Sequence, residues 1–135
     1  MKQLFTLLLI ASCLGMNAQD TPVQSFELVE NAHLVFEGQK VHFEKVISDS
    51  RCPKDVTCVM AGWAMVKLTL VTAGDNSEQS LELKIPAMLV GDVMPVVFKN
   101  DAGQLLIQKL TPYPISSEAF DARDYCLTLI WLANQ

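Results

Sequence analysis

Residues 64–71 have the sequence AMVKLTLV, in which an apolar side chain recurs at every second position. Because successive side chains of a β-strand point to opposite faces, this alternation predicts a strand with one face in a hydrophobic core. A single strand is not stable alone, so the flanking sequence should hold its partners. The predicted core face carries Ala64, Val66, Leu68 and Leu70.

Shorter β-type runs lie on both sides of this segment. The run at 125–132 is apolar on both faces, which is typical of a central strand that is covered on both sides. The spacing of the runs predicts an all-β fold, an antiparallel β-sandwich of about seven strands with the general shape of an immunoglobulin domain. The other runs are at 40–47, 81–85, 96–98 and 105–110.

Turn residues separate these runs. Residues 100–103 (NDAG) lie between two β-type runs and predict a hairpin. Pro112 and Pro114 exclude a regular central strand around Tyr113. Residues 116–122 predict a helical turn. Further loop signals are at 37–38, 73–76 and 91–92.

Residues 1–18 have the order of segments that a secretory signal peptide shows. Lys2 supplies the positive charge, residues 4–14 are mostly apolar, and Ala18 is the small residue before a cleavage site. The apolar run is shorter than the roughly 20 residues that a membrane-spanning helix needs. We therefore expect an exported protein, periplasmic or secreted, with residues 19–135 as one domain and no transmembrane segment after processing.

A second interpretation of this leader concerns Cys13. Residues 10–13 have the aliphatic, small, small, cysteine order that bacterial lipoprotein processing recognises. Cleavage there would leave Cys13 with a lipid anchor, whereas cleavage after Ala18 would release the domain. We favour release after Ala18, because the apolar run before Cys13 is short. Both routes lead to an exported protein.

The domain is acidic. The chain holds 10 Lys and Arg against 15 Asp and Glu. Removal of residues 1–18 takes away Lys2 and no acid, which leaves 9 basic against 15 acidic residues and a formal charge of −6. Phosphate backbones and anionic headgroups repel such a surface, so nucleic acid and bare membrane are poor partners.

Residues 49–62 form the one segment that differs from ordinary strand and turn sequence. Cys52 and Cys58 are six positions apart, and Pro53 restricts the backbone between them. In an exported protein, this spacing favours a Cys52–Cys58 disulfide. Pairing of either cysteine with Cys126 is the alternative. In the favoured arrangement, Cys126 is a buried free thiol.

The order of residues in this segment resembles a pattern found in small, functionally uncharacterised exported bacterial proteins of a type common in Bacteroidetes. The pattern, DSRCP-x-x-V-x-C-x-x-AG, matches residues 49–62. The resemblance implies an all-β domain in which a disulfide-closed loop leads into a central strand, with a Pro-rich turn before a closing strand that contains Tyr125. Met60 departs from the pattern, which has Trp at that place. The resemblance implies no activity.

The residues give little indication of a catalytic site or a metal-binding site. The chain has two histidines, His33 and His42, and no Gly-x-Ser-x-Gly motif, so nothing indicates a hydrolytic triad. We expect a non-enzymatic protein without a metal or a cofactor. A periplasmic copper-binding protein that uses Met60, Met88 and the histidines is one alternative, although the methionines lack a tight spacing.

The favoured function is that of a binding module of the bacterial cell envelope, whose partner is an unidentified protein or glycan. The candidate interaction loop is Arg51, Pro53, Lys54 and Asp55, since a rigid loop loses little entropy on docking. The main alternative is a protease inhibitor in which Arg51 or Lys54 is read by a trypsin-like enzyme. In the opposing interpretation, which we favour over the inhibitor, Arg51 pairs with Asp49 or Asp55 and the loop stabilises the fold.

Overall fold

Eight β-strands make up the described part of the chain, which is residues 23–87, 93–119 and 123–134. The computed structural model has no helix within these ranges. The predictions for the signal peptide, Cys13 and Met88 concern residues outside them. The strands are β1 Gln24–Val29, β2 His33–Phe36, β3 Gln39–Asp49, β4 Trp63–Thr72, β5 Glu78–Pro86, β6 Val96–Lys99, β7 Gly103–Thr111 and β8 Cys126–Ala133.

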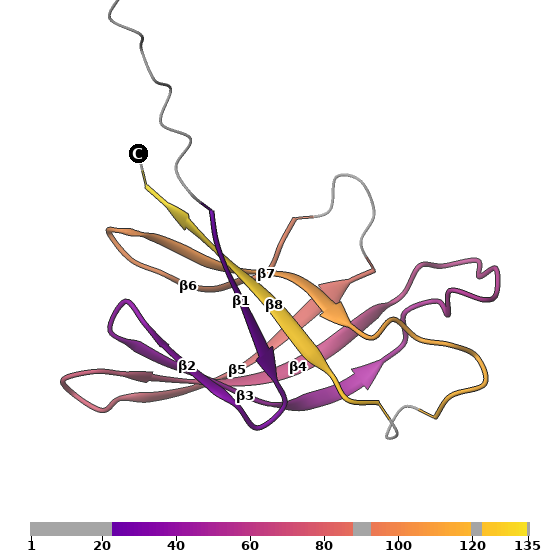
Figure 1. Cartoon of the computed structure of the whole chain (residues 1–135), viewed down its shortest axis with the longest axis horizontal. Coiled ribbons are helices and arrows are strands. Elements are labelled where there is room, and N and C mark those ends of the chain that lie inside the picture. Colours follow the sequence, from indigo (N-terminus) through magenta and orange to yellow (C-terminus); the bar gives the residue numbers. More distant parts are fainter. Residues whose placement is uncertain (1–22, 88–92, 120–122, 135) are drawn as a thin grey trace, which may run out of the picture.

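Two antiparallel four-stranded sheets pack face to face, which confirms the predicted β-sandwich (Figure 1). One sheet has the order β1-β8-β7-β6 and the other the order β2-β3-β4-β5. In each sheet, strands that follow one another in the sequence lie side by side. β1 is the exception, because it pairs with the last strand, β8, and so joins the beginning of the described chain to its end.

The core lies between the two sheets and is built by alternating side chains. On β4 the predicted face is confirmed, since Ala64, Val66 and Leu68 are fully buried and Leu70 nearly so. Alternate residues of β8 and β7 meet this face from the other sheet. The facing residues are Leu105, Ile107, Leu127 and Leu129.

Two strands were missing from the sequence-based expectation. β1 and β2 are short, and β2 has only the four residues of His33–Phe36. The predicted hairpin at 100–103 is confirmed, because the Asn100 side chain accepts hydrogen bonds from the backbone N–H groups of Ala102 and Gly103 at 2.9 and 3.0 Å.

Two long connections lie at one end of the sandwich (Figure 1). One is the β3–β4 connection, residues 50–62, which we call the disulfide loop. The other is the β7–β8 connection, residues 112–125, of which 120–122 lie outside the described ranges. Residues 116 and 117 form a simple turn and no helix, in contrast to the expectation. The β2–β3, β4–β5 and β6–β7 hairpins lie at the opposite end.

Candidate functional site

The disulfide loop continues the β3–β4 ladder beyond the strand ends. The N–H of Ser50 donates to the carbonyl of Trp63 at 2.9 Å, and the N–H of Cys52 donates to the carbonyl of Ala61 at 2.8 Å. Cys52 and Cys58 form a disulfide, as favoured from their spacing, with their Cα atoms 5.9 Å apart. The base of the loop is therefore closed by backbone hydrogen bonds, and the disulfide ties Cys52 at the base to Cys58 within the loop.

Gly62 allows the two sides of the loop base to approach. Its φ is +74°, a backbone conformation that side chains with a Cβ rarely adopt. A Cβ at this position would lie 2.0 Å from the carbonyl oxygen of Ser50, far inside van der Waals contact. Glycine is thus required at position 62 for both conformation and space.

A buried ion pair holds the beginning of the loop. Arg51 Nη2 lies 2.6 Å from Asp49 Oδ2, and Arg51 Nε donates to Asp49 Oδ1 at 2.8 Å. The side chain of Asp49 has no exposed surface, and that of Arg51 is 2% exposed. The two-point geometry is the strong form of an arginine–carboxylate pair.

Arg51 also fastens the loop to the β7–β8 connection. Its Nη1 donates to the carbonyl of Leu110 at 2.7 Å, and its Nη2 donates to the carbonyl of Pro112 at 3.0 Å. The guanidinium lies over the ring of Tyr113, 4.6 Å from the ring centre. The protease-inhibitor alternative needs an accessible Arg51. The structure shows instead the favoured interpretation, in which Arg51 pairs with Asp49 inside the protein.

Tyr125 and Arg123 complete a network around Asp49. The Tyr125 hydroxyl donates to Asp49 Oδ2 at 2.9 Å and accepts from Arg123 Nη1 at 3.1 Å. Arg123 Nη1 itself lies 3.6 Å from Asp49 Oδ2. The network thus joins the end of β3, the start of the disulfide loop and the approach to β8.

The electrostatics of this network follow from its geometry. Burial alone would raise the pKa of Asp49, but the hydrogen bonds and positive charge of Arg51 outweigh it, and the pKa lies below its usual value. Burial raises the pKa of Tyr125, and its hydrogen bond to the Asp49 carboxylate acts in the same direction. Asp49 is therefore ionised and Tyr125 neutral over the physiological range.

A second set of contacts joins the loop to the β7–β8 connection. The N–H of Lys54 donates to the carbonyl of Pro114 at 3.0 Å. The carboxylate of Asp55 accepts from the backbone N–H of Ser116 at 2.9 Å and from the Ser116 hydroxyl. Asp55 was a candidate interaction residue, but its carboxylate already serves this internal contact. Of the candidate loop residues, Pro53 is half-buried and Lys54 is exposed.

The tip of the disulfide loop presents apolar side chains to solvent. Val59 is 104% exposed and Met60 69%, while Val56 is 46% exposed. These residues were not among those expected to mediate contacts. Their sequence signal is the absence of charge over residues 56–63, directly beside a cysteine pair and outside the predicted strands. We call Val56, Val59 and Met60 the apolar tip.

The apolar tip also has backbone N–H groups that are free to bind a partner. Among the described residues, the N–H groups of Thr57, Cys58, Val59 and Met60 have no hydrogen-bond acceptor. At the foot of the tip, Trp63 is partly exposed, and Lys84 Nζ lies 3.8 Å from the centre of its ring. The tip therefore offers apolar surface together with free backbone donors.

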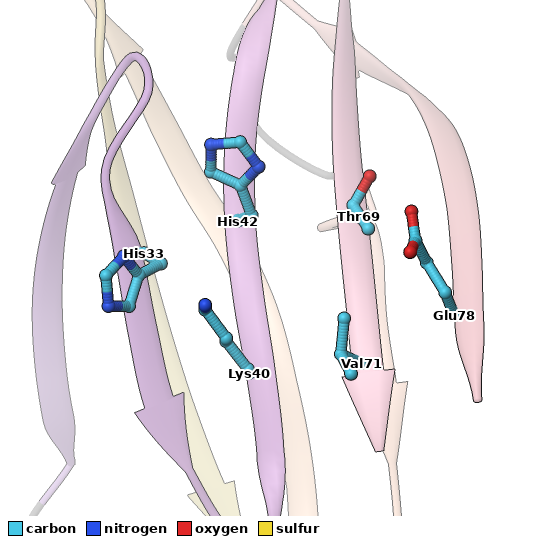
Figure 2. A pocket seen from close by; sticks show the side chains of 6 residues that line it. All are labelled: His33, Lys40, His42, Thr69, Val71 and Glu78. Carbon is cyan, nitrogen blue, oxygen red and sulfur yellow. The ribbon is translucent and has the colours of Figure 1, made fainter. Parts of the chain in front are cut away.

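The two histidines lie far from this loop, on the outer face of the β2-β3-β4-β5 sheet (Figure 2). They line a shallow hollow of about 240 Å³ together with Lys40, Thr69, Val71 and Glu78. Of the methionines that the copper alternative considers, Met60 is on the apolar tip. Met60 and the two histidines therefore do not lie together in one site. In the described ranges, no three or more His, Cys, Asp or Glu side chains are grouped as a metal site.

Cys126 is the third cysteine of the domain and is a free thiol. It begins β8, pairs across the sheet with Val29 and is half-buried. The alternative pairings of Cys126 with Cys52 or Cys58 are excluded by the Cys52–Cys58 bond.

Comparison with known proteins yields no match to a protein-family model, a curated protein or a solved structure. Within the described ranges, no helix has the length and apolar character that crossing a membrane requires.

Proposed function

We propose that this protein is an exported, non-enzymatic module that binds another protein of the cell envelope through its disulfide loop. The observation that carries the proposal is the contrast between the base and the tip of that loop. Buried charge and backbone hydrogen bonds hold the base, and a disulfide ties the base to Cys58, whereas Val59 and Met60 are exposed to solvent. Exposed apolar side chains on a rigid support fit a contact site, because little entropy is lost on docking.

A protein partner suits the apolar tip better than a lipid surface does. Hydrocarbon offers no acceptor for the free N–H groups of residues 57–60, and each unpaired group there would cost several kcal/mol. A protein can supply carbonyl acceptors beside apolar pockets for Val59 and Met60. The acidic charge of the domain also opposes approach to anionic lipid.

A glycan partner is less well supported than a protein. Sugar rings are held mainly by exposed aromatic faces and by arrays of polar side chains, whereas the tip offers Val56, Val59 and Met60. The nearest aromatic ring is that of Trp63, and Lys84 covers one of its faces.

The protease-inhibitor alternative is weakened, because its main residue, Arg51, is not accessible to a protease. Arg51 is buried in the Asp49 network and cannot enter a specificity pocket without breaking it. Lys54 alone remains as an exposed basic side chain of the loop. We therefore expect no inhibition of trypsin-like enzymes that depends on Arg51.

The proposal is tested by site-directed photo-cross-linking in the producing cell. A photoreactive phenylalanine analogue at Val59 should cross-link to a defined envelope protein. The same analogue at Val35, which is also exposed but lies on the edge strand β2, is the matched control and should not. Val59→Asp and Met60→Asp should abolish co-purification of that protein. Equal cross-linking from both positions, or sedimentation of the domain with lipid vesicles, would contradict the proposal.

A further inference from the structure

The two histidines are directly opposite one another on neighbouring strands. β2 and β3 form an antiparallel hairpin, in which His33 pairs with His42. The turn residues Glu37 and Gly38 both have positive φ, as in the common two-residue hairpin turn. The hairpin is short, so the position of each pair in its ladder follows from the turn.

His33 and His42 occupy a non-hydrogen-bonded pair of this ladder. Hydrogen-bonded and non-hydrogen-bonded pairs alternate from the closing pair, Phe36 with Gln39, which is hydrogen-bonded in a two-residue hairpin. The next strand position agrees, because Phe43 N–H donates to the carbonyl of Ala32 at 3.0 Å. Side chains of non-hydrogen-bonded pairs are the closer ones, with Cβ atoms about 4.5–5.5 Å apart.

Two imidazoles at this spacing suit a divalent transition metal ion. Imidazole nitrogen is a preferred ligand of Cu²⁺, Ni²⁺ and Zn²⁺, and Cu²⁺ is bound most tightly by a given nitrogen site. In Figure 2 the rings of His33 and His42 project from the same face but point in different directions. His33 is exposed and His42 half-exposed, so rotation about their side-chain bonds can turn both rings to one ion.

The surroundings of the pair carry charge of both signs. Lys40 projects from β3 beside the histidines, and Glu78 lines the same hollow (Figure 2). Glu44 lies two residues beyond His42 on the same face, where it is bound to Thr69 and to Lys67. In the described ranges no third His, Cys, Asp or Glu side chain is grouped with the pair, so we expect water to complete the coordination of a bound ion.

We propose that His33 and His42 form a two-imidazole site for a divalent transition metal ion, with Cu²⁺ as the preferred ion. The site is independent of the disulfide loop and of the function proposed for it. It uses no methionine, in contrast to a thioether site for Cu(I), and it needs no movement of the backbone.

The test is a titration of the mature protein with Cu²⁺, with glycine as a competing ligand, combined with electron paramagnetic resonance of the loaded form. We expect one ion per chain and coupling to two nitrogen nuclei. Because the chain has two histidines in all, His33→Gln and His42→Gln each leave one imidazole. Each should weaken binding roughly tenfold or more, since the second contact of a chelate is lost.

Lys40→Gln gives a change in the opposite direction. Loss of the neighbouring positive charge should tighten Cu²⁺ binding about two- to fivefold. Lys99→Gln, on β6 of the other sheet, is the matched control and should leave the affinity unchanged. Val59→Asp should also bind Cu²⁺ as the unchanged protein does, which separates this site from the disulfide loop.

Two results would overturn the proposal. One is equal Cu²⁺ affinity for the unchanged protein and the His33→Gln, His42→Gln double variant, which would place the ion on groups other than the histidines. The other is an electron paramagnetic resonance spectrum in which Cu²⁺ couples to a single histidine nitrogen and which is unchanged in either the His33→Gln or the His42→Gln variant.

Discussion

The carboxylate of Asp49 and the guanidinium of Arg51 form a two-point ion pair inside the protein, with Nη2–Oδ2 at 2.6 Å and Nε–Oδ1 at 2.8 Å. The two residues are separated by Ser50 alone, yet Arg51 also reaches carbonyl groups of Leu110 and Pro112. A local pair thereby fixes a loop to a segment about sixty residues away in the sequence.

Replacement of Arg51 should destabilise the domain strongly. Arg51→Met removes the partner of a buried carboxylate and should lower the free energy of unfolding by about 3–5 kcal/mol in a urea titration. Lys54→Met is the control on the same loop, because Lys54 is exposed, and it should change stability by less than about 0.5 kcal/mol. The double variant Asp49→Asn, Arg51→Met should regain part of the loss. Equal effects at positions 51 and 54 would refute the role of the ion pair.

Acid should weaken the domain through Asp49. The pKa of Asp49 is lowered in the folded protein, so its contribution to stability is present above its unfolded pKa of about 4 and is lost as the pH falls through the folded value. The stability of Asp49→Asn should therefore be lower at pH 7 and should vary less below pH 4. Denaturant titrations at a series of pH values measure this. Parallel pH profiles for the two proteins would contradict the assignment.

The hydroxyl of Tyr125 should contribute through its contacts with Asp49 and Arg123. Tyr125→Phe deletes both hydrogen bonds and should lower the free energy of unfolding by about 1–3 kcal/mol, because their partners are charged. The matched control is Tyr113→Phe, which retains the ring that lies against Arg51. It should cost less than about 0.5 kcal/mol. A larger loss for Tyr113→Phe than for Tyr125→Phe would reverse the interpretation.

Gly62 and Gly38 have the same backbone conformation but differ in the room available for a Cβ atom. Their φ angles are +74° and +73°, but a Cβ at Gly38 meets nothing within 4 Å, whereas at Gly62 it meets the Ser50 carbonyl. Gly38→Ala should cost about 1–2 kcal/mol for conformation alone. Gly62→Ala should cost about 3 kcal/mol or more, since the loop base must open. Similar melting temperatures for the two variants would show that the base of the loop is not close-packed.

The Cys52–Cys58 disulfide should determine the number of free thiols and should contribute to stability. The mature, unlipidated protein should show one reactive thiol after denaturation, that of Cys126, and three after reduction. Cys52→Ser with Cys58→Ser should lower the free energy of unfolding by about 2 kcal/mol, because the bond closes a short loop. Cys126→Ser is the control and should leave the Cys52–Cys58 bond intact. Three free thiols in the untreated protein would contradict the pairing.

The sequence predicted those features that depend on neighbours along the chain. The alternation at 64–71, the hairpin at 100–103 and the Cys52–Cys58 pair are all local patterns, and all are found. The surroundings of Arg51 were not predictable in this way. Its acceptors, Leu110 and Pro112, come near only once both sheets have formed.

The pairing of His33 with His42 also could not be predicted from local sequence patterns. The alternation around His42 places it on the outer face of its strand. Its partner was not predicted, because His33 belongs to β2, a strand that was not expected from the sequence. The apolar tip was overlooked for another reason: apolar residues outside predicted strands are usually buried, and Val59 is not.

The disulfide loop divides its residues into two groups whose substitution should have different consequences for the fold. Asp49, Arg51, Gly62 and the two cysteines hold the base, and substitution there threatens folding. Val56, Val59 and Met60 stand clear of those contacts, so they can change without loss of the fold. These three positions are thus suited to the engineering of designed binders on this scaffold.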